Sequence, residues 1–139
     1  MTFRNEGMEQ PKTDIVFSPV VLDKRPTAEH DKHNRELLEY LERHGNLHPR
    51  PNPKALPKVA YPCVLHEVKR GCCSLETAED QLSKSVIFSL EIQKELCLFV
   101  GGSTADMLPV VGIVNVGDRV FVYLACYVDD ERIVSHRTP

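Results

Sequence analysis

The chain has 139 residues, and its 42% hydrophobic and 27% charged content are those of a single soluble globular domain. A net charge of -3 at pH 7 excludes a strongly basic protein, so contact with nucleic acid would have to come from a local patch. The polar opening sequence does not resemble a signal peptide, and the longest apolar run, 120–128, is too short to span a bilayer. We therefore expect an intracellular protein, cytoplasmic or nuclear, with no membrane partner.

The cysteines follow no pattern of a disulfide framework or a zinc site. Their number, five, is odd, two of them are adjacent, and no pair has the Cys-x-x-Cys spacing of zinc ligands. We expect reduced thiols and no disulfide at Cys63, Cys72, Cys73, Cys97 and Cys126.

The first third of the chain predicts an extended arm followed by one helix. Residues 14–22 are β-like but interrupted by Pro19, which favours an edge strand or an arm, and we expect 1–26 to be partly flexible. Thr27 is a good N-cap, and residues 28–44 follow without glycine or proline, so we predict a helix there. The residues expected on its buried stripe are Leu37, Leu38 and Leu41.

Histidines and prolines mark this helix and the segment that follows it. His30, His33, His44 and His48 allow either a metal cluster or a charged helix face in solvent, and the second is favoured because no acidic or thiol partner is clearly placed beside them. Residues 46–58 hold four prolines, which predicts a rigid extended connection. It is the one clearly basic segment, because it carries Arg50, Lys54 and Lys58. It is either a solvated connection or, as the alternative, a contact for phosphate.

The middle of the chain predicts a strand and then a long helix. Residues 59–69 are typical of a strand and 70–73 of a turn, after which Ser74 or Thr77 can cap a helix over 76–95. An apolar ladder at i, i+4 spacing should pack that helix on a sheet: Ala78, Leu82, Val86 and Leu90. Gln81 falls at the border of this buried face, where it could reach a site at the strand end.

The last third of the chain predicts a strand hairpin. Residues 108–114 and 119–128 are nearly continuous apolar runs, which suggests central strands covered on both sides, and 115–118 form the turn. The order of elements therefore predicts an α/β fold, a mixed central sheet of 59–69, 108–114 and 119–128 flanked by both helices.

The charged pair Glu67 and Lys69 lies on this predicted strand. Side chains two residues apart on a strand project from the same face, and two charges on a buried face are costly unless they pair or hold a metal ion. Glu-x-Lys on a strand, followed by a helix with Ala-Glu-x-Gln and then a hairpin, resembles the PD-(D/E)XK nuclease superfamily, most of all its divergent fungal nuclease-like domains. The matching residues are Glu67, Lys69, Glu79 and Gln81, within a resemblance that covers 31–127.

This resemblance implies a restriction-endonuclease-like core over 27–139 and a Mg²⁺-dependent phosphodiesterase acting on nucleic acid. It implies that Glu67 and the main-chain carbonyl of Val68 are metal ligands, that Lys69 activates water and that Gln81 orients the site. A further acidic ligand is expected ten to twenty residues before Glu67, but no aspartate lies between Asp31 and Asp80.

The position closest to the missing ligand is Asn52, and Glu39 or Glu42 could substitute for it. A neutral amide oxygen holds a hard dication less strongly than a carboxylate. The resemblance as it stands therefore predicts a short or truncated nuclease-like domain that cleaves DNA or RNA poorly or not at all. The alternative is a non-catalytic α/β binding or interaction module.

Overall fold

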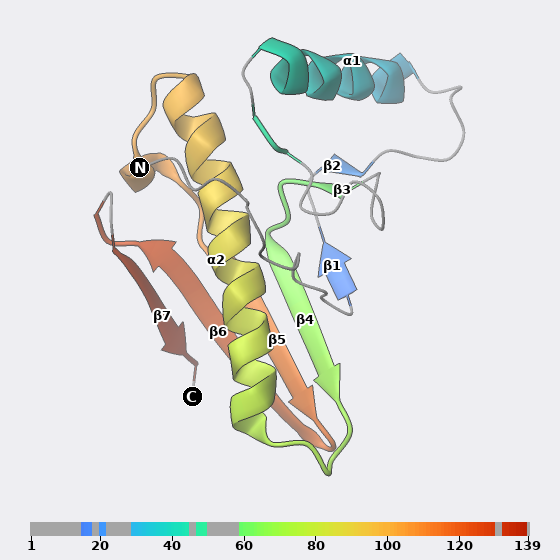
Figure 1. Ribbon diagram of the computed structural model, residues 1–139, viewed down its shortest axis with the longest axis vertical. Helices are drawn as coiled ribbons and strands as arrows, with labels where there is room; N and C mark the ends of the chain where they lie inside the picture. Colours follow the sequence, from blue (N-terminus) through green and yellow to red (C-terminus); the bar gives the residue numbers. More distant parts are fainter. Residues whose placement is uncertain are drawn as a thin grey trace.

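The computed structural model describes residues 15–17, 20–21, 29–44, 47–49, 59–129 and 132–138. Figure 1 shows a long helix lying lengthwise over a mixed sheet, with a second helix crossing at one end. The strands are β1 (Ile15–Phe17), β2 (Val20–Val21), β3 (Val59–Ala60), β4 (Val64–Lys69), β5 (Val110–Val116), β6 (Arg119–Tyr127) and β7 (Ile133–Arg137). The helices are α1 (Glu29–His44), α2 (Leu75–Phe99) and the short 3-10 helix η1 (Thr104–Asp106). The predicted α/β class is confirmed.

The main sheet has the order β1-β4-β5-β6-β7, and β4 and β5 are its one parallel pair. Parallel neighbours require a crossover connection, and here that connection is α2. The remaining pairs are antiparallel, with Ile15 opposite His66 in the pair of β1 and β4. β1 thus stands at the edge of the sheet, as the proline-interrupted sequence predicts.

Helix α2 begins one residue before the predicted start, 76, and ends four residues after the predicted end, 95. The Ser74 side chain accepts a hydrogen bond from the Thr77 amide, so Ser74 is the N-cap. The predicted ladder is buried against β4, β5 and β6. Gly112 on β5 lets this helix approach closely, because a Cβ there would lie 2.8 Å from Leu82 Cδ2. Gly101, with φ of 78°, follows the C-terminal end of the helix.

The predicted single strand over 59–69 is wrong. It is divided into β3, which pairs with β2 in a separate two-stranded sheet, and β4. Tyr61 has a φ of 52° between them, and Pro62 lacks the amide proton that a strand ladder uses. The chain therefore leaves one sheet and enters the other within three residues.

The predicted hairpin is confirmed with a tighter turn. β5 continues through Asn115 and Val116, so the loop is reduced to Gly117 and Asp118, and Gly117 has the positive φ expected of a two-residue turn, 61°. β7, which pairs with the second half of β6, was not predicted. Its five residues include Ser135, His136 and Arg137, which weaken the apolar signal of a strand.

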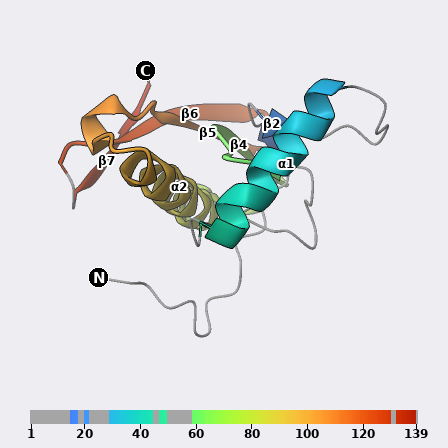
Figure 2. The same cartoon turned by 90° about the horizontal axis from the view of Figure 1, so that it is seen from above.

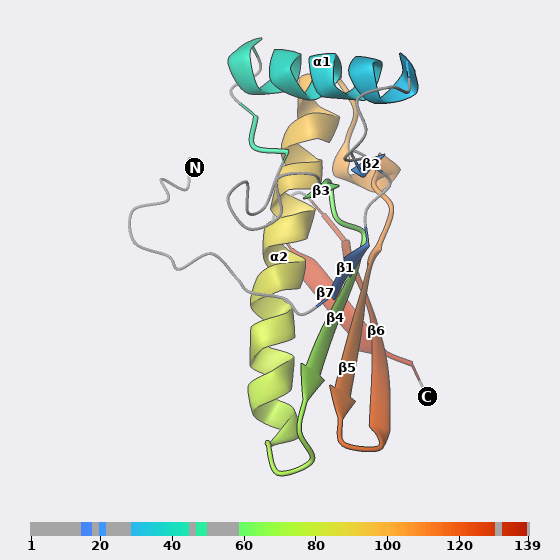
Figure 3. The same ribbon diagram turned by 90° about the vertical axis from the view of Figure 1, so that its right-hand side faces the viewer.

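One face of the sheet is packed under α2 and the other is not. Figures 2 and 3 show α2 on a single side, which we call the covered face. On the opposite side, the open face, Val68, Val120 and Leu124 keep 44%, 58% and 41% of their surface exposed. The prediction that both strands of the hairpin are covered on both sides is therefore wrong for β6, whereas the residues of β5 on this side are half-buried.

Helix α1 lies across the C-terminal end of α2 (Figures 1 and 3). Leu38 and Leu41 are buried there with Ala60, Tyr61 and Ile92, whereas Leu37 is 55% exposed, so only two leucines of the predicted stripe are buried. No helix of the described residues is long and apolar enough to cross a membrane. None of the five cysteines forms a disulfide in the structure.

Candidate functional site

The alternation of β4 directs Leu65, Glu67 and Lys69 toward α2 and Val68 away from it. Glu67 is 1% exposed although it is a carboxylate, and Val68 beside it is exposed although it is apolar. This reverses the usual distribution, in which acidic residues are almost never fully buried unless they are paired. β4 therefore places a charge inside the domain at a specific point.

Lys69 is the partner of this buried carboxylate. Its Nζ lies 2.6 Å from Glu67 Oε1, and the lysine side chain remains 24% exposed, so the pair connects the interior to the surface. The second carboxylate oxygen, Glu67 Oε2, is buried and has no hydrogen-bond partner among the described residues. A buried acceptor without a partner is costly, and such atoms are expected where a ligand, an ion or water completes the site.

Gln81 and Glu79 lie on opposite flanks of α2. Glu79 accepts a hydrogen bond from the Tyr123 hydroxyl on β6. Its side chain therefore points toward β6, away from β4 and Glu67. Gln81 shares a flank with Phe88 and Ile92, which pack beside β3. It is thus on the side of β4, but its side chain is exposed and has no hydrogen bond to Glu67 or Lys69 among the described residues.

The other ligands implied by the resemblance lie apart or outside the description. Asn52 is not among the described residues. Glu39 and Glu42 are on α1, across the C-terminal end of α2, whereas β4 ends beside the N-terminal end of that helix (Figures 1 and 3). The 25 residues of α2 separate these ends by about 37 Å at 1.5 Å per residue, so α1 cannot supply the missing carboxylate.

Another acidic residue, Asp14, lies next in sequence to the strand that pairs with β4. β1 is the antiparallel partner of the strand that carries Glu67, although the two are about fifty residues apart in the sequence. Asp14 is the residue directly before β1 in the sequence and is itself outside the described residues. The sequence analysis considered Asn52, Glu39 and Glu42 for the missing ligand and left out Asp14, which begins the β-like segment 14–22.

The described residues alone do not make a complete cation site. No group of three or more histidine, cysteine, aspartate or glutamate side chains gathers in them. Glu67 supplies one buried carboxylate oxygen without a partner, which fits one ligand of a hard cation.

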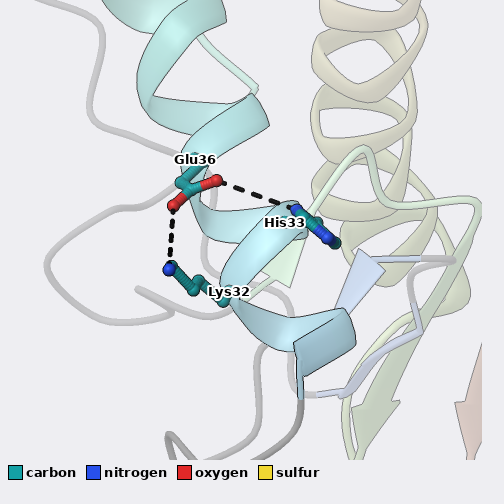
Figure 4. A network of polar contacts seen from close by, with 3 residues as sticks. All are labelled: Lys32, His33 and Glu36. Carbon is teal, nitrogen blue, oxygen red and sulfur yellow. Dashed lines mark ion pairs between the residues drawn. The ribbon is translucent and has the colours of Figure 1, made fainter.

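The histidines of α1 that the structure describes belong to a charged surface. Figure 4 shows Glu36 between Lys32 and His33, at 3.9 Å and 3.8 Å, and all three side chains are more than half exposed. His44 lies against Tyr40, with 4.7 Å between the ring centroids. The interpretation as a solvated helix face therefore agrees with these contacts.

Two tyrosines of β6 bind carboxylates of α2, which the sequence analysis did not anticipate. The hydroxyls of Tyr123 and Tyr127 donate hydrogen bonds to Glu79 and Glu91. Burial and the hydrogen bond to Glu79 raise the pKa of Tyr123 to about 12, against a smaller lowering by Arg137. Burial and Glu91 likewise raise the pKa of Tyr127. These bonds fix the rotation of α2 over the sheet and leave the flank of Gln81 on the side of β4.

An apolar hollow of about 370 Å³ lies between α1 and the end of α2. Burial, with Glu95 and Glu42 nearby, raises the pKa of Tyr61 in its wall to about 12. No lysine, arginine or carboxylate lines it, so it is not suited to a phosphodiester. The lining residues are Asn34, Leu37, Leu38, Tyr40, Leu41, Tyr61, Leu96, Phe99 and Val100.

In comparisons with known proteins, no family model, no curated protein and no solved structure matches this chain. The functional argument therefore depends on the chemistry of Glu67 and Lys69 and on the elements that position them.

Proposed function

We propose that this chain is a nuclease-like domain that engages the phosphodiester backbone of nucleic acid at Glu67 and Lys69. The observation that carries the proposal is the Glu67 carboxylate, which is buried, bound to Lys69 through one oxygen and without a partner at the other. Stability alone does not account for this pair, because well-packed apolar residues are often at least as stable as a buried ion pair.

The arrangement of elements supports a restriction-endonuclease-like core as part of the same proposal. The strand with Glu67 and Lys69 leads into α2, and α2 leads into the hairpin of β5 and β6, which is the order that the resemblance implies. β5 is parallel to β4, so the helix between them lies over the sheet beside the charged pair.

Within this proposal, Lys69 is the residue that reaches the substrate. Its ammonium is partly exposed and is held by Glu67, so it presents a fixed positive charge to a phosphate oxygen or a water beside it. Arg70 follows it at the surface and adds a second cation. A divalent cation, when bound, would neutralise charge on the phosphate and acidify a water.

A second carboxylate is required for such a cation to bind well, and we propose Asp14 for it. Asp14 is next in sequence to a strand that pairs with β4, whereas Asn52 offers a neutral oxygen. If neither residue contributes, the alternative function follows: a non-catalytic module that binds nucleic acid through Lys69. The observation that favours this alternative is that no group of three or more histidine, cysteine, aspartate or glutamate side chains gathers in the described residues.

The test measures Mg²⁺ and Mn²⁺ binding by calorimetry and the cleavage of DNA and RNA by the full chain. The variants are Glu67→Gln, Asp14→Asn, Asn52→Asp and Lys69→Met, with Glu36→Gln on the exposed face of α1 as the matched control. Circular dichroism verifies that each variant is folded.

We expect the wild-type chain to bind the cation. The affinity should fall by at least about tenfold in Glu67→Gln and in Asp14→Asn, and it should be unchanged in Glu36→Gln. Tighter binding in Asn52→Asp together with no effect of Asp14→Asn would assign the second position to Asn52 instead. Nucleic-acid binding that requires Lys69, without cation binding, would establish the non-catalytic module. A chain that binds neither cation nor nucleic acid would contradict both.

A further inference from the structure

The open face of the sheet is an apolar surface with no formal charge. The strands β4, β5, β6 and β7 turn no lysine, arginine, aspartate or glutamate toward it. Its polar members are His66, Asn115 and His136, and its most exposed apolar members are Val68, Val120 and Leu124. Exposed apolar side chains that are contiguous, rather than scattered, mark an interaction surface.

Sheet register makes this surface continuous. Val68 of β4, Asn115 of β5 and Val120 of β6 stand in one row across the sheet. Leu124 stands in a parallel row farther along, next to His136 of β7. The row between them is formed by Val122 of β6, Ile113 of β5 and His66 of β4, which are half-buried, so the two exposed rows are joined through it.

The size of the patch suits a small dimer interface. Four strands at a spacing of about 4.8 Å and seven residues at about 3.3 Å each give about 450 Å² in projection. The accessible surface is larger than this projection, and the smaller stable interfaces bury about 600 Å² per partner.

The chemistry of the patch points to a second copy as its occupant. The patch has no charge with which to select a differently charged partner, and two copies would meet there without repulsion between like charges. Two such sheets can stack about 10 Å apart with interdigitating side chains, the packing of a β-sandwich.

We propose that two copies of this chain associate through their open faces, so that the sheets stack and each α2 lies on the outside of the dimer. Association leaves the covered face and the pair of Glu67 and Lys69 untouched, since these lie on the other side of the sheet. This inference is independent of the proposed nuclease-like function.

The test is sedimentation equilibrium of the full chain and of two double variants. Val120→Glu with Leu124→Glu places charges on the open face. Ile87→Glu with Leu108→Glu is the matched control, because those residues are 47% and 77% exposed and lie outside that face. Circular dichroism and thermal melting of each variant verify that the fold persists.

The expected result is a wild-type mass of two chains, dissociation at least about 100-fold easier in the open-face variant, and a control that behaves as wild type. A wild-type chain that stays monomeric at all accessible concentrations would overturn the proposal. So would a dimer that both double variants weaken equally, or that neither weakens.

Discussion

The two faces of the sheet are formed by the same strands but bury different chemistry. The covered face holds Leu65, Val110 and Val114 under α2, together with the carboxylate of Glu67. The open face exposes Val68 and Val120. At Glu67 and Val68 the polarity of β4 is thus inverted, because the charged residue is inside and the apolar residue is outside. Local hydrophobicity is therefore a poor guide to burial at the point of the chain that we regard as functional, and a strand that departs from the ordinary pattern is where a site is expected.

Truncation of apolar side chains should give the largest difference in unfolding free energy between the two faces. Leu90→Ala removes a fully buried contact between α2 and the sheet and should cost about 3 kcal/mol of unfolding free energy. Leu124→Ala on the open face should cost less than about 1 kcal/mol at high dilution, where chains are separate. Urea denaturation measures both values. Equal losses would show that the open face is packed in the single chain.

Removal of the lysine partner should reveal the cost of a buried charge. Lys69→Met leaves the Glu67 carboxylate inside the domain without its partner, and we expect a loss of about 3 kcal/mol at pH 7. Lys84→Met, on the exposed side of α2, should change stability by less than about 0.5 kcal/mol. A Lys69→Met variant as stable as wild type would mean that Glu67 is solvated.

Enlargement of a side chain should also destabilise the covered face more than the open face, but by a smaller free energy than truncation. Gly112→Ala introduces a Cβ 2.8 Å from Leu82 Cδ2 beneath α2, and we expect a loss of about 1 to 2 kcal/mol. Val122→Ile, which points to the open face, should be neutral within about 0.5 kcal/mol. Thermal melting of the two variants compares them, and a neutral Gly112→Ala would contradict the close approach of the helix.

The tyrosines of the covered face predict a modest loss of stability at alkaline pH. In the unfolded chain a tyrosine ionises near pH 10, whereas the folded-state pKa of Tyr123 is raised to about 12. The folded state therefore retains this proton while the unfolded state loses it, and stability should fall as pH rises from about 10 to 12. Tyr123→Phe should reduce this dependence. An identical pH profile in that variant would contradict burial of the hydroxyl against Glu79.

The sequence predicted those features that follow from a single element, and it failed where two distant segments meet. The ladder of α2, its cap at Ser74 and the turn at Gly117 are local consequences of spacing and of one residue's conformational range. The division of 59–69 at Tyr61 arises because Pro62 interrupts the ladder and the two halves find different partners, a tertiary outcome. The bond of Tyr123 to Glu79 joins residues 44 positions apart, and no periodicity in either segment contains it.

The candidate site shows the same limit. Glu-x-Lys spacing correctly placed Glu67 and Lys69 on one face, because strand alternation is local. Burial of Glu67 and the unsatisfied Oε2 depend on how α2 lies over β4, and the pairing of β1 with β4 depends on the whole sheet. Proximity to Glu67 in the sequence therefore indicated Asn52 and gave no indication that β1 is the strand beside β4.

The functional role of the Glu67 carboxylate is tested most directly by an NMR titration of the full chain with Mg²⁺ and then with paramagnetic Mn²⁺. We predict shifts and broadening confined to the backbone amides around Glu67, Val68 and Lys69 and those of β1, and their loss in Glu67→Gln with the rest of the spectrum unchanged. No response at these amides, or a response that survives in Glu67→Gln, would contradict a cation site at the buried carboxylate.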